Sequence, residues 1–128
     1  MRTARIGIDG TEYVLCFSGR TMRACTERYG DVSKIAEALD TKDTVKALDE
    51  TIWLLSALMD AGARYCRLNG VECPDPLSYD ELYDRVDIPD MSSLRYKVME
   101  TINAGKEATV VARPGKNTEA TLVEAPAP

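Results

Sequence analysis

TIWLLSALM, residues 51–59, contains the longest nearly apolar run of the chain. Apolar residues recur around it at helical spacing, from an N-cap at Asp43 to Asn69-Gly70. The stripe that they form consists of Val45, Leu48, Ile52, Leu55, Met59, Ala63 and Cys66. We therefore expect one long helix here, the longest of the fold.

Three further apolar side chains, Trp53, Leu54 and Leu58, widen this stripe beyond a normal amphipathic face. Such a helix is buried on more than one side, as the central helix of the domain or partly as an interface with another chain. Trp53 is the only tryptophan, and tryptophan is often an anchor at protein interfaces. Two interpretations of the three side chains stay open: packing in the core, and contact with a protein partner.

A β-hairpin is expected ahead of the long helix. Two stretches within residues 4–17 are rich in β-branched and aromatic residues, and they flank Asp9-Gly10. Asp-Gly supplies the positive φ angles of a two-residue type I′ turn. Alternation places Val14 and Cys16 on the strand face opposite to Tyr13, Leu15 and Phe17. An isolated hairpin is marginally stable in water, so this one must lie against helices.

Two shorter helices are expected between the hairpin and the long helix. Ser18 is a candidate N-cap for the first, which runs to about Tyr29 and ends at Gly30. Its buried stripe is predicted to be Met22, Cys25 and Tyr29. Asp31 starts the second helix, which carries Val32, Ile35, Ala36 and Leu39 on one side.

Two more helices are expected after the long one. Ser78 and Glu81 form a capping box for a short helix that ends near Val86, and Asp90 caps a last helix that finishes at Gly105. Residues 106–128 are dominated by small residues, proline and polar groups, which predicts a disordered tail. The fold class is thus α+β and mostly α: one domain, 1–105, with an N-terminal hairpin packed on about five helices.

The composition excludes several classes of function. The chain has no histidine, which removes Ser-His and Cys-His nucleophile pairs and ordinary zinc-enzyme sites. Its four cysteines form no CxxC, and its net charge of −5 repels phosphate backbones and anionic lipid headgroups. No apolar signal segment follows the basic N-terminal residues, and no apolar run approaches the roughly 20 residues of a membrane span. We expect a soluble cytoplasmic protein without metal, cofactor, membrane or nucleic-acid partner.

Individual candidate sites also have plain structural explanations. Acidic side chains fit solvated helix turns, caps and loops better than a metal site. They are Asp40, Asp43, Asp49, Glu50, Asp80, Glu81, Asp84, Asp87 and Asp90. Cys25 lies near two arginines but falls on an apolar stripe, so we expect a core thiol. Gly7, Gly10 and Gly19 match no phosphate-binding motif. Arg20, Arg23 and Arg28 give the first helix a basic side that a helix-turn-helix regulator would use on DNA.

The order of these signals resembles the tail assembly chaperones of long-tailed phages and prophages of Gram-positive hosts. The likeness covers about residues 4–105, and order and spacing carry it rather than any single motif. Its segments are IDGTEYVL (8–15), ERYGD (27–31), VSKIAEAL (32–39), TIWLLSALM (51–59) and PLSYDEL (76–82). Ser18-Gly19 departs from the family, in which a stronger helix former is usual at the start of the first helix.

The resemblance implies a non-catalytic chaperone in the host bacterial cytoplasm. It would bind the tape-measure and tail-tube proteins during viral tail morphogenesis. Self-association is a separate expectation, which follows from the wide apolar surface of the long helix. Members of the family often occur as a short form and a longer form made by programmed frameshift, and the tail here suits the short form. An A-rich slippery heptamer can encode Gly115-Lys116-Asn117, so the nucleotide sequence tests that expectation. The competing hypothesis is a small DNA-binding transcriptional regulator of a phage or prophage.

Overall fold

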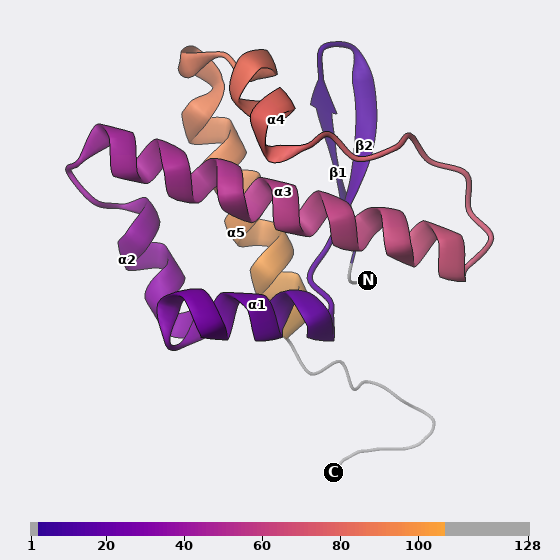
Figure 1. Ribbon diagram of the computed structural model, residues 1–128, viewed down its shortest axis with the longest axis horizontal. Helices are drawn as coiled ribbons and strands as arrows, with labels where there is room; N and C mark the ends of the chain where they lie inside the picture. The colour runs from indigo at the N-terminus through magenta and orange to yellow at the C-terminus, as the bar shows by residue number, and fades with distance from the viewer. Residues whose placement is uncertain (1–2, 107–128) are drawn as a thin grey trace, which may run out of the picture.

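The long helix organises the molecule. The computed structural model describes residues 3–106 of the chain. Its elements are β1 (Thr3–Ile8), β2 (Thr11–Cys16), α1 (Gly19–Tyr29), η1 (Val32–Lys34), α2 (Ile35–Leu39), α3 (Thr44–Leu68), α4 (Tyr79–Arg85), η2 (Ile88–Asp90) and α5 (Met91–Lys106). Figure 1 shows α3 crossing the middle of the molecule, with α5 crossing behind it and the hairpin beside both. The expected α+β, mostly α fold is confirmed. Apart from Lys106, the predicted tail lies outside the described residues.

The hairpin forms at the predicted turn. Asp9 and Gly10 have φ angles of 51° and 81°, the pair of positive values that a type I′ turn needs. The strands are antiparallel, with Ile8 opposite Thr11 and Ile6 opposite Tyr13. An ion pair between Arg85 Nη1 and Asp9 Oδ2, 3.0 Å apart, ties the tip of the hairpin to the end of α4.

Helix α3 covers the outer edge of β2. A Cβ atom placed on Gly62 would lie 1.8 Å from the carbonyl oxygen of Val14, so only glycine permits this approach of helix to strand. The approach explains why Val14 and Cys16, on the face opposite to Tyr13, are also buried. Alternation alone did not predict this burial.

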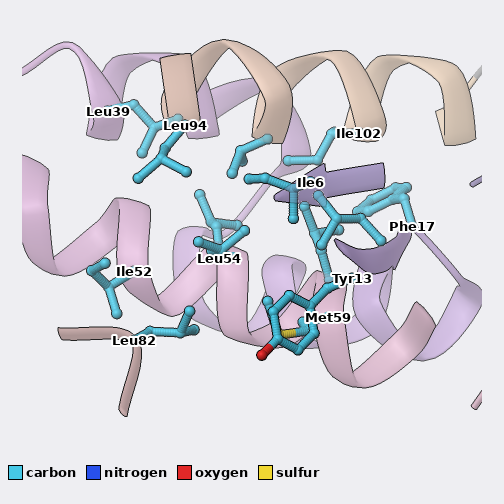
Figure 2. Close-up of a cluster of buried hydrophobic side chains, with 14 of the residues drawn as sticks. Ile6, Tyr13, Phe17, Leu39, Ile52, Leu54, Met59, Leu82, Leu94 and Ile102 are labelled. Atoms are coloured by element: carbon cyan, nitrogen blue, oxygen red, sulfur yellow. The ribbon is translucent and has the colours of Figure 1, made fainter. Parts of the chain in front are cut away.

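One hydrophobic core joins the hairpin to all the long helices. Its completely buried side chains include Leu15, Ile35, Ile52, Leu54, Leu55, Leu58, Leu82, Val98 and Ile102. Figure 2 shows Leu54 near the centre of this cluster, with Leu94 and Ile102 of α5 above it and Met59 and Tyr13 below. Hairpin and helices therefore bury one common apolar surface instead of forming separate units.

The helix caps lie where the sequence placed them. The side chains of Ser18 and Asp43 accept hydrogen bonds from the backbone N–H groups of Thr21 and Lys46. Ser78 and Glu81 form the expected capping box at the start of α4. These signals are local, so the structure of distant segments does not change them.

Some details of the helices differ from the prediction. Met22 is 48 % exposed and Val45 is 67 % exposed, so neither belongs to a buried stripe. Helix α1 instead buries Thr21 together with Cys25, one of the predicted residues, and Tyr29 is partly buried against the core. Val45 lies in the first turn of α3, ahead of the first buried residue of that helix, Ala47.

Unlike the start at Asp43, the predicted helix starts at Asp31 and Asp90 differ from the structure. The segment after Asp31 begins as the 3₁₀ turn η1 and becomes α-helical only at Ile35. Asp90 closes the 3₁₀ turn η2, and α5 runs from Met91 to Lys106 rather than ending at Gly105. A single tight turn before each helix is common at helix N-termini.

Candidate partner-binding surface around Trp53

Trp53 belongs to α3, and its half-buried side chain packs against residues of α1. The guanidinium carbon of Arg28 lies 4.4 Å from the centroid of its indole ring, within the range of a cation–π contact. The ring of Tyr29 meets the indole edge-on, with centroids 6.0 Å apart and an interplanar angle of 81°. Trp53 is thus neither a fully buried core residue nor a free surface residue.

Glu50, one turn before Trp53 on α3, binds both neighbours of the indole ring, Arg28 and Tyr29. Its carboxylate accepts two hydrogen bonds from Arg28, from Nε at 2.8 Å and from Nη2 at 3.1 Å. The Tyr29 hydroxyl donates to the same carboxylate at 2.6 Å. In this bidentate ion pair 13 % of the Glu50 side chain and 36 % of the Arg28 side chain are exposed, so the carboxylate is the better shielded partner. Together, Arg28, Tyr29, Glu50 and Trp53 form what we call the Trp53 cluster.

The charges of the Trp53 cluster are fixed at neutral pH. Hydrogen bonds from Arg28 hold the pKa of Glu50 below its usual range, and the same contact raises the pKa of Arg28. Burial, followed by the hydrogen bond to Glu50, raises the pKa of Tyr29. Glu50 is therefore an ionised, fully engaged carboxylate and Tyr29 a neutral donor. This arrangement suits a fixed contact surface and does not suit acid–base catalysis, which needs a group that titrates near the working pH.

Acid should weaken the Trp53 cluster. Because the pKa of Glu50 is lower folded than unfolded, its contribution to stability is present above its ordinary pKa and is lost as pH falls through the folded value. Glu50→Gln keeps the shape and removes the charge, so the stability gap between wild type and variant should be largest near pH 7 and shrink toward pH 3. Urea unfolding monitored by Trp53 fluorescence measures this gap, with Glu37→Gln on an exposed glutamate as control. A gap that is the same at both pH values contradicts the assignment.

The structure corrects two of the three predicted partner-binding residues. Leu54 and Leu58 are completely buried in the core, so neither can touch a partner while the fold is intact. They point to the side of α3 that faces the hairpin and α5, whereas Trp53 lies on the side near α1. The wide apolar stripe is explained mainly by core packing on several sides, and Trp53 alone remains a candidate for contact.

A second aromatic pair lies on α4. Tyr79 and Tyr83 pack edge-to-face, 5.2 Å apart, and both are half-buried. The hydroxyl of Tyr83 donates to the carboxylate of Asp49, the neighbour of Glu50 on α3. Two aromatic pairs are thus held by adjacent acidic residues of one helix. Asp49 and Glu50, which the sequence suggested were merely a solvated face, are the residues that hold these aromatic side chains in place.

The other candidate residues have structural roles. Cys25 is completely buried, and burial raises the pKa of its thiol to about 11, which makes it a poor nucleophile. Asp80 and Asp84 are exposed on α4. Within residues 3–106, no three His, Cys, Asp or Glu side chains gather where they could hold a metal ion. In the same residues no helix is both long and apolar enough to cross a membrane.

The arginines of α1 do not form one free basic face. Arg28 is held by Glu50, and Arg23 lies 3.5 Å from Glu27, its neighbour one turn later. Only Arg20 is left of the three that a DNA-binding interpretation would use.

The Trp53 cluster was not predicted from the sequence. In the sequence Arg28 belongs to a basic helix side, Tyr29 to an apolar stripe and Glu50 to a solvated face, and no local pattern joins the three. The one available signal was the spacing of Glu50 and Trp53, which places them on the same side of a helix. Comparison with known protein families gives no match for this chain, and neither the curated proteins nor the solved structures provide one.

Proposed function

We propose that the protein is a tail assembly chaperone of a long-tailed bacteriophage or prophage, a non-catalytic protein that binds tape-measure and tail-tube proteins in the host cytoplasm. One observation supports this most. The elements follow the order that the resemblance implies: a hairpin closed by Asp9-Gly10, a helix ending at Tyr29-Gly30, a long helix carrying Trp53, and a capped helix starting after Ser78. The residues that carry the resemblance thus coincide with the turns and caps of the fold.

The contact surface is proposed to be the Trp53 cluster. Tryptophan, tyrosine and arginine are the residue types most enriched among the energetically dominant residues of protein interfaces. Here all three are in contact and already ordered by Glu50, so little side-chain entropy is lost when a partner binds. No cofactor takes part. Self-association through the same surface would compete with partner binding.

The test starts from the genome that encodes the chain. The tape-measure protein of that genome is co-expressed with tagged wild type and with the Trp53→Ala and Tyr96→Ala variants. Tyr96 is 70 % exposed on α5 and is the matched aromatic control. Wild type and the Tyr96 variant should co-purify with soluble tape-measure protein. The Trp53 variant should lose about tenfold or more of the complex, since a central tryptophan is worth 2 kcal/mol or more at such interfaces.

Circular dichroism separates loss of folding from loss of contact in the Trp53 variant. If folded Trp53→Ala protein binds as well as wild type, the surface is wrong. If wild type binds neither the tape-measure nor the tail-tube protein, or the genome encodes neither, the function is wrong.

The alternative, a DNA-binding transcriptional regulator, is less well supported because Arg28 and Arg23 are already paired with carboxylates. It requires duplex binding that weakens steeply with salt. Saturable binding of this kind at low salt, lost on Arg20→Ala, would favour the regulator over the chaperone.

A further inference from the structure

The two outer edges of the hairpin differ in what covers them. Helix α3 covers the edge of β2 at Gly62, whereas β1, within residues 3–106, pairs with β2 alone and has a second, outer edge. That outer edge forms one wall of a cavity of about 380 Å³, and the other wall comes from the end of α4, from η2 and from the first half of α5. The cavity, which we call the β1 groove, follows five consecutive residues, 5–9.

The backbone of β1 offers hydrogen bonds to this groove. In a two-residue hairpin the closing pair, here Ile8 and Thr11, exchanges both of its backbone hydrogen bonds. Because bonding alternates along an antiparallel strand, Ile6 also faces β2, while Gly7 and Arg5 direct N–H and C=O outward. The same alternation directs the Val14 carbonyl away from β1, where Gly62 meets it. Nothing lies within 4 Å of a Cβ placed on Gly7, so the face of the strand toward which that Cβ points is open at this residue.

The lining of the β1 groove mixes apolar and charged side chains, and acidic and basic residues lie toward opposite ends. Buried Ile6, Ile8 and Leu94 supply the apolar surface. Strand β1 and helix α5 run in opposite directions in Figure 1, so the start of α5 lies near the hairpin turn and its later residues lie near the start of β1. Charged residues of the two elements therefore gather at the two ends of the groove. Arg5 and Lys97 lie toward the end away from the turn, and each also forms an exposed ion pair with a glutamate outside the groove, Glu12 at 3.7 Å and Glu100 at 3.0 Å. Asp87 and Asp90 lie near the turn, where Arg85 is already paired with Asp9.

We propose that the β1 groove binds an extended peptide segment, which adds to the hairpin as a third strand antiparallel to β1. Strand addition gives affinity through main-chain hydrogen bonds and specificity through alternate side chains. The charges define the occupant. Its N-terminal end lies near Asp87 and Asp90 and carries a cation, its C-terminal end lies near Arg5 and Lys97 and carries a carboxylate, and every second side chain between them is apolar.

The volume of the groove fits this occupant. A cavity of about 380 Å³ lies at the small end of ligand-sized sites, which suits a single strand of a few residues. The proposal does not depend on a role in tail assembly, because it concerns the chemistry of the segment and not its source. The Trp53 cluster lies on α1 and α3, so the two surfaces involve different residues.

The first experiment uses the full chain and a fluorescein-labelled peptide, Lys-Val-Thr-Val-Thr-Val-Glu. Fluorescence anisotropy should show saturable binding with a Kd below about 1 mM. Two further peptides carry N-methyl groups on alternate residues, so each has only one edge able to form hydrogen bonds. One of the two should bind like the parent peptide and the other should lose binding about tenfold or more. Equal binding by both, or by neither, overturns strand addition.

The second experiment tests orientation by exchanging charges. Lys97→Glu should weaken binding of the parent peptide about two- to fivefold, the range of an exposed ion pair, and a peptide with its terminal Glu changed to Lys should recover that loss on the variant. Ser93→Ala, also at the groove, is the control for substitution without charge change. Tighter binding of the order-reversed peptide Glu-Val-Thr-Val-Thr-Val-Lys contradicts the antiparallel orientation.

A second copy of the chain is the alternative occupant of the β1 edge. Analytical ultracentrifugation across a range of protein concentrations distinguishes it. Dimers that dissociate when the peptide is added would assign the edge to self-association and overturn the proposal. A mass that stays constant while the peptide binds supports it.

Discussion

Replacing Gly62 by alanine is expected to lower the free energy of unfolding by about 2–4 kcal/mol. Alanine in a helix normally gains about 1 kcal/mol over glycine. At this position the added methyl group would lie 1.8 Å from the carbonyl oxygen of Val14 and 2.4 Å from its carbon. Neither atom is at the end of a flexible side chain, so α3 and β2 must move apart along their whole contact.

Thermal and urea denaturation measure this loss, and the midpoint temperature should fall by roughly 10 °C or more. Gly19→Ala is the matched control, because Gly19 begins α1 and nothing lies within 4 Å of a Cβ placed there. The control should be neutral or slightly stabilising. Equal effects of the two substitutions would show that helix α3 does not press against the strand at Gly62.

Leu54→Ala should have the second large effect, a loss of about 2–5 kcal/mol. Leu54 is completely buried at the centre of the core between the hairpin and α5 (Figure 2), and its truncation leaves a cavity there. Leu68→Ala on the same helix is the control, because Leu68 is 86 % exposed. Its effect should stay within about 0.5 kcal/mol.

The same pair of variants separates core packing from partner contact. If Leu54 touched a partner, Leu54→Ala would weaken binding while leaving the unfolding midpoint of the isolated chain unchanged. The buried position predicts the reverse: a lower midpoint, and binding that is normal whenever the variant is kept well below that midpoint.

The sequence predicted most of the turns, caps and element order, because these depend on neighbouring residues. Asp9-Gly10 forms a type I′ turn in any chain that brings two strands together, and Ser78 with Glu81 caps a helix from within four residues. The length of α3 was also predicted, since its cap at Asp43 and its end at Asn69 are local signals.

Contacts between distant segments could not be predicted. No local pattern distinguishes Gly62 from the other residues of its helix, because its role depends on contact with β2. Likewise, Arg28 and Glu50 are 22 positions apart in the sequence. The same limit explains the error over Leu54 and Leu58. A helical pattern shows how wide an apolar surface is, but which neighbours cover that surface depends on how the hairpin and α5 pack on it.

The contact between Gly105 and Phe17 has a consequence for the time course of synthesis. A Cβ on Gly105 would lie 2.6 Å from the Cβ of Phe17, so the end of α5 closes directly over the residue that follows the hairpin. At a translation rate of 5–20 residues per second, roughly 4–18 seconds separate these two residues on the ribosome. During that interval the apolar face of the nascent hairpin lacks its α5 cover. Until its last helix emerges, the newly made chain therefore exposes apolar surface of the kind that makes folding intermediates prone to aggregation.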